Sequence, residues 1–265
     1  MIEPYYSDKY VTIYHGDCRD ILPELPKVDL VLTDPPYNVG KEDWDNIDLG
    51  EVFPLVKECM YDGSSIYIFS GIKTLESLLH TANNNFRQLN VLIWLYPNGM
   101  NRLVNNWQIC YDPIYFGRKG DKHTFNTPRL PYTKGTQERI KNPVIKGGKE
   151  WRPNPEGRKM ENVIVVPCLN HGSGAGERTS HPTQKPKDII NYLIEASSNQ
   201  GNLILDPFLG SGTTCYCAKK LNRKSIGIEI EEKYCEIAAN RCRQSVLEFG
   251  DIDTNTIASK QPTMV

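Results

Sequence analysis

Long apolar runs are absent from this chain of 265 residues, of which 39% are hydrophobic and 24% are charged. No window approaches the roughly 18 consecutive apolar residues expected of a membrane-spanning helix. The opening MIEPYYSDKY also lacks the basic stretch followed by an apolar run that marks an export signal. We therefore expect a cytoplasmic protein with no membrane partner, large enough to bury one substantial core plus an insertion.

Paired metal-binding cysteines are missing as well. The chain has no Cys-x-x-Cys pair, and no histidine stands at zinc-ligand spacing from a cysteine. We therefore expect no metal site. Reduced, mostly buried thiols are the favoured interpretation of the cysteines, which are Cys18, Cys59, Cys110, Cys168, Cys215, Cys217, Cys235 and Cys242.

Net charge is also nearly absent, since its formal value is -1. This average conceals the segment from Gly117 to Lys159, which carries 12 Lys and Arg against 4 Asp and Glu, whereas the remainder carries 19 against 28. A local basic excess of this size is expected of a surface that contacts a phosphate backbone. A solvated loop is the alternative interpretation of the same charges.

The apolar pattern on both sides of the basic segment predicts an α/β fold. We expect a Rossmann-like, mostly parallel sheet with covering helices and an antiparallel edge hairpin formed by Leu89–Leu95 and Ile109–Phe116. Residues 117–180 read as an insertion, and residues 248–265 as a flexible tail. The other predicted strands are Val11–Tyr14, Val28–Thr33, Ser65–Phe69, Asn202–Leu205 and Ser225–Ile230, and helices are predicted around Leu49–Met60, Lys73–Asn83, Lys187–Ser197, after Gly212 and at Lys233–Leu247.

A glycine turn follows one of these strands in the sequence Asp206-Pro-Phe-Leu-Gly210-Ser-Gly212-Thr-Thr. Such a turn lets a ligand approach the backbone closely at a helix N-terminus. A dinucleotide site would have a third glycine where this chain has Cys215, which disfavours the alternative of an NAD-dependent Rossmann enzyme. Glu229 ends the next predicted strand, where a carboxylate can accept two hydrogen bonds from a ribose diol.

The tetrapeptide Asp34-Pro35-Pro36-Tyr37 directly follows another predicted strand. An aromatic amine is a poor nucleophile because its lone pair is delocalised, so its N–H groups must be held by acceptors that favour a pyramidal nitrogen. The Asp34 carboxylate and the Pro35 carbonyl can supply these acceptors, and Tyr37 offers a face on which a planar base can stack. A rigid turn after a strand is the structural alternative.

The order of these motifs resembles the β class of amino-methylating DNA methyltransferases, in which the catalytic motif precedes the cofactor motif. Thr33-Asp-Pro-Pro-Tyr-Asn38 comes first, the basic insertion follows, and His181-Pro-Thr-Gln-Lys-Pro186 leads into the glycine turn. The resemblance covers roughly residues 10–116 and 181–245. It implies a catalytic S-adenosylmethionine-dependent domain at 1–116 and 181–247, with 117–180 as the inserted target-recognition region.

The resemblance also implies the roles of particular residues. Asp34, Pro35, Pro36 and Tyr37 are implied to be catalytic, and the implied cofactor is S-adenosyl-L-methionine. Glu229 is placed on the ribose, and Asp17 and Cys18 on the cofactor's base. Thr183 and Lys185 are implied to be methionine-side or pocket contacts. The full implied cofactor set is Asp17, Cys18, Asp34, Thr183, Lys185, Asp206, Phe208, Gly210, Ser211, Gly212, Thr213 and Glu229. Taken singly, Asp17 could equally be a helix N-cap.

The implied reaction is methylation of the exocyclic N6 of adenine in a base flipped out of double-stranded DNA, as in restriction-modification. Asp rather than Ser at position 34 favours adenine over N4-cytosine. An RNA base or a protein amide is an alternative substrate, and C5-cytosine chemistry would need a nucleophile such as Cys168. Trp44, in the loop after the reaction centre, is interpreted as either a packing residue or a stacking wedge. A homodimer is compatible with the sequence.

Overall fold

The computed structural model describes residues 2–36, 47–98, 105–169 and 177–244. Within these residues the chain divides into two compact units. Residues 127–161 form the smaller one, which we call the basic unit. The described residues before 127 and after 161 form the larger one, which we call the main unit.

The main unit is built on one mixed sheet. Its described strands are β1 (Tyr6–Ser7), β2 (Val11–His15), β3 (Val28–Thr33), β4 (Met60–Phe69), β5 (Arg87–Leu95), β6 (Tyr111–Arg118), β11 (Val163–Val165), β12 (Leu203–Asp206) and β13 (Lys224–Glu229). They lie in the order β1-β2-β13-β12-β3-β4-β6-β5-β11. The strands from β2 to β4 are mutually parallel, β6 is antiparallel to both neighbours, and β1 is antiparallel to β2.

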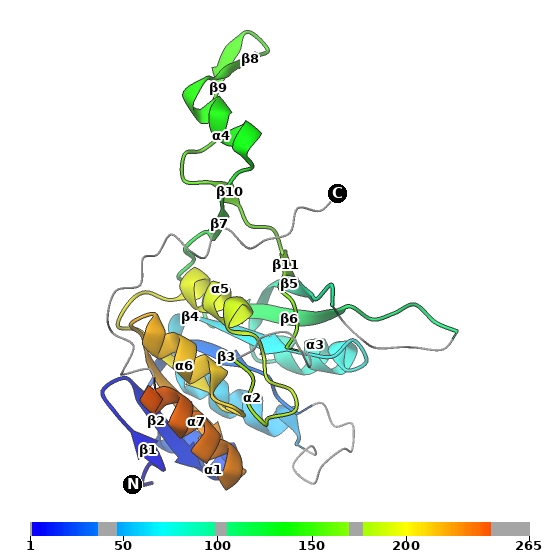
Figure 1. Ribbon diagram of the computed structural model, residues 1–265. Helices are drawn as coiled ribbons and strands as arrows, with labels where there is room; N and C mark the ends of the chain where they lie inside the picture. Colours follow the sequence, from blue (N-terminus) through cyan, green and yellow to red (C-terminus); the bar gives the residue numbers. More distant parts are fainter. Residues whose placement is uncertain (1, 37–46, 99–104, 170–176, 245–265) are drawn as a thin grey trace. The chain divides into compact units, whose positions relative to one another are not determined.

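Helices cover both faces of this sheet. They are α1 (Cys18–Ile21), the short 3-10 helix η1 (Leu22–Glu24), α2 (Leu49–Glu58), α3 (Leu75–Asn83), α5 (Lys187–Ser197), α6 (Thr213–Lys220) and α7 (Glu232–Gln244). Phe53 of α2 and Leu78 of α3 belong to one buried cluster, whereas Cys215 of α6 and Ala238 of α7 pack with Ile13 of β2 in another. Figure 1 shows α5, α6 and α7 side by side along one face of the sheet.

The central strands explain why the sheet lies inside the main unit. Leu30 and Val31 of β3 and Ile204 and Leu205 of β12 are fully buried. A continuous apolar run of this kind, instead of an alternating one, is expected where helices cover both faces of parallel strands. Burying each such side chain stabilises the fold by about 1.5–3 kcal/mol. The predicted parallel sheet is therefore confirmed, together with the helices that cover it.

The predicted antiparallel hairpin is confirmed as β5 and β6, although spatial order departs from chain order. β6 lies between β4 and β5, and β11 adds to the outer side of β5 in parallel. The indole Nε1 of Trp94 in β5 donates to the Val166 carbonyl oxygen at 2.8 Å, which fixes the segment that contains β11. The apolar run at 163–166, which the sequence placed in the insertion, therefore belongs to the main sheet.

The basic unit has little core of its own. It comprises β7 (Arg129–Leu130), α4 (Lys134–Lys141), β8 (Val144–Lys146), β9 (Lys149–Trp151) and β10 (Arg158–Lys159). β7 pairs with β10 and β8 with β9, both antiparallel. Gly147 and Gly148 connect β8 to β9 with φ angles of 56° and 75°, the left-handed values that a two-residue hairpin turn requires. No residue of α4, β8 or β9 is buried.

Several predictions from the sequence fall on other parts of the chain. Tyr37, Trp44 with its loop, and the tail from residue 248 lie outside the described residues. Strand β3 and helix α5 have the predicted bounds, and the other predicted elements differ by a few residues at their ends. Among the described helices, none has the length and apolar character needed to cross a membrane.

Candidate active site

Four acidic residues of the sequence motifs meet at one edge of the sheet. Asp17 follows β2, Glu229 ends β13, Asp206 ends β12, and Asp34 follows β3. These strands are adjacent and parallel, so their carboxyl ends lie together. All four residues line a cavity of about 560 Å³. Ligands of open α/β sheets bind in the crevice outside these strand ends.

The reaction-centre motif forms one wall of the cavity. Asp34, Pro35 and Pro36 all line it. Asp34 forms an ion pair with Lys185, and their side chains are 23% and 11% exposed. The Lys185 Nζ also lies 5.2 Å from the centre of the Phe69 ring, at the end of β4. The Asp34 carboxylate is therefore aimed at a partly enclosed space, with a cation beside it.

The glycine turn and Glu229 are joined by a hydrogen bond. The Gly210 backbone N–H donates to Glu229 Oε2 at 2.8 Å, and the Glu231 N–H donates to Oε1 at 2.9 Å. Gly210 has a φ of 53°, a left-handed conformation that glycine adopts without strain. Burial raises the pKa of Glu229. The carboxylate keeps one further lone pair on each oxygen, which suits two hydroxyl donors.

Gly212 is the one predicted cofactor residue that the structure does not place in the cavity wall. It caps α6 with a φ of 78°, and a Cβ at this position would stand 2.6 Å from the Ala238 Cβ of α7. The second glycine of the motif therefore allows α6 and α7 to pack closely at the turn. Ser211 and Thr213 on either side of it do line the cavity.

Asp206 is the most deeply buried carboxyl group of the cavity, with 4% of its surface exposed. Its Oδ1 accepts from the Thr33 hydroxyl at 3.0 Å and from the Phe208 N–H at 3.2 Å. Burial raises its pKa to about 7, against the opposing effect of these hydrogen bonds. The residue links β12 to β3 and holds the start of the glycine turn beside the reaction centre.

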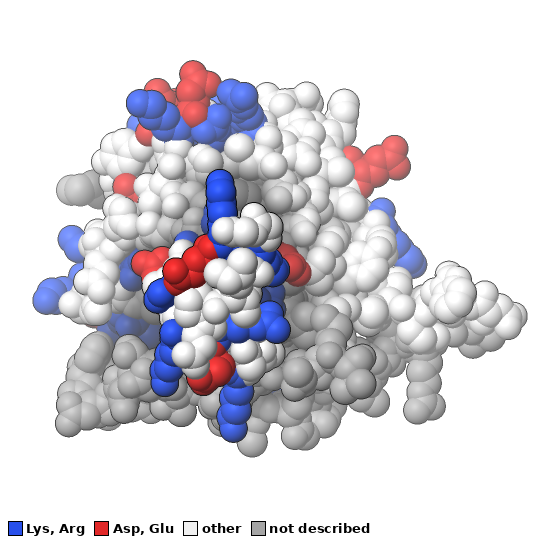
Figure 2. Space-filling model, turned by 90° about the horizontal axis from the view of Figure 1, so that it is seen from above, with Lys and Arg blue, Asp and Glu red and all other residues white. Residues whose placement is uncertain are grey.

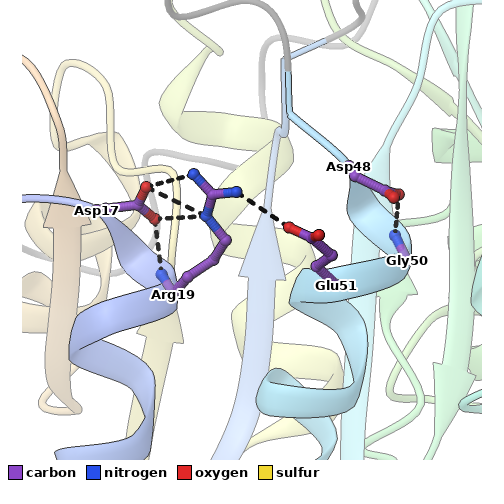
Figure 3. Close-up of polar contacts among 5 residues, drawn as sticks. All are labelled: Asp17, Arg19, Asp48, Gly50 and Glu51. Atoms are coloured by element: carbon purple, nitrogen blue, oxygen red, sulfur yellow. Dashed lines mark hydrogen bonds and ion pairs between the residues drawn. The ribbon is translucent and has the colours of Figure 1, made fainter.

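Asp17 is the N-cap of α1, which is one of its two interpretations from the sequence, and it also lines the cavity. It accepts from the Arg19 N–H at 2.8 Å, and the Arg19 guanidinium contacts both of its oxygens, with a shortest distance of 2.7 Å (Figure 3). Arg19 also reaches Glu51 of α2 at 3.0 Å. Asp48 caps α2 in the same region by accepting from the Gly50 N–H at 2.7 Å. The adjacent Cys18 lines the cavity, and burial raises its pKa to about 12.

The segment that precedes α5 closes another side of the cavity. Thr183 and Lys185 line it, together with His181. Burial lowers the pKa of His181 to about 4, so the imidazole is neutral at pH 7. Its ring meets Tyr234 of α7 edge to face, with 4.4 Å between ring centroids. His181 belongs to the motif that carries the resemblance, and its part in the wall was not predicted.

Most of the cavity residues that the sequence did not predict are apolar or lie at strand ends. The sequence does not show whether a single apolar residue of a strand faces the cavity at the sheet edge. These residues therefore could not be predicted from the sequence. These residues are Gly16, Arg19, Leu32, Ile47, Phe69, His181, Pro182, Gln184, Ile190, Pro207, Leu209, Thr214, Ile228, Ile230 and Tyr234.

A second hollow of about 420 Å³ adjoins the first. Both are lined by Pro35, Pro36, Ile47 and Phe69. The rest of its wall comes mainly from α2 and α3 and is rich in hydroxyl groups, namely Ser70, Thr74, Ser77 and Thr81. The reaction-centre motif therefore lies between a larger cavity and a smaller one that has hydroxyl groups in its wall.

Cys168 stands apart from both hollows, since it lines neither. Its backbone is held by Asn98, which donates to the Cys168 carbonyl at 2.9 Å and accepts from its N–H at 2.8 Å. This placement does not support the alternative in which Cys168 attacks a base.

The basic unit carries nine Lys and Arg against four Asp and Glu. Three of the arginines pair with neighbouring acids, at Arg129–Glu156, Arg152–Glu150 and Arg158–Glu161. Lys146 lies 4.5 Å from the ring centre of Trp151, which is 39% exposed. Figure 2 shows Lys and Arg side chains in blue and Asp and Glu side chains in red. This surface is suited to a polyanion.

Comparisons with known proteins agree with this geometry. A family model described as DNA methylase matches residues 28–240. The chain is 33% identical over 242 residues to the type II methyltransferase M1.MboII of Moraxella bovis, covering 84% of this chain and 92% of that protein. It is 30% identical over 255 residues to the DNA adenine methyltransferase YhdJ of Escherichia coli (strain K12), covering 89% and 84%. The crystal structure of the M1.HpyAVI-SAM complex matches with a TM-score of 0.64 at 26% identity, covering 87% of this chain and 98% of that one.

Proposed function

Because this chain belongs to the DNA methylase family, we propose that it methylates the exocyclic N6 of adenine in double-stranded DNA. The observation that carries the proposal is the meeting of Asp34, Asp206 and Glu229 around one cavity. One wall thus offers acceptors for an amine, and another offers a carboxylate and a glycine turn for a nucleoside cofactor. The NAD alternative does not account for the first wall.

S-adenosylmethionine fits the larger cavity by the chemistry of its walls, and it supplies an electrophilic methyl group on a sulfonium. We assign Glu229 to the ribose hydroxyls, and the segment Asp17–Cys18 to the adenine ring. Arg19 already occupies both Asp17 oxygens, so contact with the base requires Asp17 to share them. Phe208, Gly210, Ser211 and Thr213 line the remaining wall of this site.

Asp34 and Pro35 hold the target amine. The carboxylate and the carbonyl accept its two N–H groups, which frees the nitrogen lone pair from the ring. The lone pair forms the N–C bond as the S–C bond breaks, and the Asp34 carboxylate takes the proton that the nitrogen then releases. Tyr37 remains assigned to stacking on the base by its sequence position. We place the base in the smaller hollow, whose hydroxyl groups can contact its edge.

Adenine is supported by the name of one relative and by Asp34. The relative from Escherichia coli is named a DNA adenine methyltransferase. N4-cytosine and an RNA base are the alternatives within the same chemistry. The basic unit, inside the segment 117–180, is proposed as the target-recognition region because its charge suits a DNA backbone. The relative from Moraxella bovis is a type II methyltransferase, which supports restriction-modification. We place the protein in the cytoplasm, with a homodimer as a further element of the proposal.

Single-molecule sequencing of DNA from cells that express the protein tests the substrate. We expect N6-methyladenine within one recurring motif that is absent from an empty-vector control. Methylcytosine in that motif would mean that the target base is cytosine and not adenine. The absence of any methylated motif would contradict a DNA substrate.

Replacement of Asp34 by alanine tests the site. We expect methyl transfer to fall by at least about 1000-fold, because the reacting amine then lacks an acceptor. Cofactor affinity, measured by calorimetry, should largely remain. The control is Asp62→Ala, which removes an exposed carboxylate of β4. Loss of both transfer and cofactor binding in Asp34→Ala would mean that Asp34 is a structural residue.

A further inference from the structure

An unassigned carboxylate, Asp112, lies beside the reaction centre. It is the second residue of β6, which runs antiparallel to β4. The first residues of β6 therefore lie at the sheet edge where β3 and β4 end. The Ser70 N–H, just past β4, donates to the Pro113 carbonyl at 3.0 Å and fixes this alignment. Because β6 runs antiparallel to β4, Asp112 at the start of β6 lies near the end of β3, which Asp34 follows.

Asp112 belongs to a small polar group at this edge. The Tyr96 hydroxyl, on a side chain that is 8% exposed, donates to Asp112 Oδ1 at 3.3 Å. Burial raises the pKa of Asp112, the Lys185 charge lowers it, and the Asp34 charge raises it. One ammonium group therefore acts on two carboxylates.

Lys185 forms an ion pair with Asp34. Its ammonium group donates to Asp34 Oδ2, the kind of hydrogen bond that the target amine must make. The Lys185 side chain is 11% exposed, and its Nζ lies near the Phe69 ring, so water competes little for this contact. An incoming base and Lys185 would therefore compete for the same carboxylate.

We propose that Lys185 is a positioning residue, an inference that rests on the proposed function. Lys185 occupies the place of the target amine and moves to Asp112 when the base arrives. Asp112, held by Tyr96, is the second acceptor for the ammonium. The transfer keeps one ion pair at all times, whereas expelling Lys185 without a partner would leave a buried charge uncompensated. Base entry is then an exchange of hydrogen-bond partners. Only a hydrogen-bond donor can replace the ammonium at Asp34, so a base that presents a carbonyl oxygen there is excluded.

The test uses the full-length protein and a duplex carrying the motif found by sequencing. For Asp112→Asn we expect kcat/KM for DNA to fall by at least about tenfold, with unchanged affinity for S-adenosylmethionine, because the second acceptor loses its charge. Adding Lys185→Met to this variant should restore kcat/KM to the level of Lys185→Met alone, because no ammonium then needs a second acceptor. A double variant as slow as Asp112→Asn overturns the proposal.

A second measurement compares the binding affinity of the protein for two duplexes, one intact and one abasic at the modified position. Lys185→Met should raise the preference for the intact duplex by about tenfold, because the base no longer displaces an ammonium. Lys187→Met, a neighbouring lysine on α5 that lines neither hollow, is the control and should leave both readouts unchanged. An unchanged preference, or loss of cofactor binding in Lys185→Met, overturns the proposal. A missing methylated motif would instead contradict the proposed function itself.

Discussion

The main unit and the basic unit place their charged residues in different environments. Asp206 and Glu229 of the main unit are 4% and 8% exposed, and backbone N–H groups hold both. In the basic unit, Lys146 and Lys149 stand in solvent on a hairpin that buries nothing. The difference follows from their proposed tasks. Aligning an amine with a methyl group needs fixed directions, whereas attraction to phosphates needs only charge at moderate distance.

The same contrast applies to what holds each unit together. The main unit buries two large clusters against its sheet. In the basic unit, ion pairs such as Arg152–Glu150, with side chains 59% and 52% exposed, lie on or beside the short strands. Exposed pairs of this kind contribute about 0–1 kcal/mol each. The basic unit is therefore expected to tolerate substitution far better than the main unit.

Substitution of one isoleucine in each unit tests this comparison and gives the largest expected effect. Ile66→Ala in β4, where the side chain is fully buried, should lower the free energy of unfolding by about 2–5 kcal/mol. Ile145→Ala in β8, where the side chain is 71% exposed, should change it by less than about 0.5 kcal/mol. Urea unfolding followed by circular dichroism measures both. Equal effects of the two substitutions would contradict the conclusion that the basic unit has little core of its own.

A pH series sharpens the comparison for charged groups. The folded-state pKa of Asp206 is about 7, above the unfolded value near 3.8, so folding favours the protonated form. The stability it contributes is present at low pH and disappears as pH rises through about 7. Between pH 5 and 8, the wild type should therefore lose about 2–3 kcal/mol relative to Asp206→Asn. Urea unfolding at both pH values gives this difference.

Glu150→Gln in the basic unit is the control for the pH series. Its side chain is 52% exposed, and the variant should follow the wild type at both pH values. An identical pH dependence in the wild type and Asp206→Asn would show that Asp206 ionises freely in the folded protein.

The smallest expected effect concerns DNA affinity. Replacing Lys141, Lys146 and Lys149 together by alanine should weaken binding by about 10- to 100-fold at fixed salt. The slope of log K against log salt should become shallower by about 0.9 for each phosphate that the lysines no longer neutralise. Fluorescence anisotropy with a labelled duplex measures both quantities. Affinity for S-adenosylmethionine should not change.

The matched control replaces Lys9, Lys27 and Lys224 by alanine. These exposed lysines precede β2 and β3 or begin β13, so they lie at the sheet edge opposite the cavity. They should barely alter DNA affinity. If both triple variants weakened binding equally, net charge would account for the attraction, and the basic unit would have no special role in it.

Local sequence patterns predicted much of the main unit. The apolar runs of β3 and β12 identified buried parallel strands, and glycine at 210 marked a left-handed turn. These features could be predicted because each depends on a few neighbouring residues. Gly212 was assigned to the cavity, whereas the structure uses it for the close contact of α6 with α7. A glycine needed for a ligand and one needed for a packed helix look alike in a sequence.

The sequence by itself determined the motif order, the chemistry of the Asp34 and Glu229 segments, and the site of excess positive charge. Only the tertiary structure decided that β6 lies between β4 and β5, and so brought Asp112 to the edge where Asp34 meets Lys185. It also placed Val163–Val165 in the main sheet as β11. Such pairings join segments that are far apart in the chain. They depend on which strand edges remain open for pairing, and no local run of residues encodes that choice.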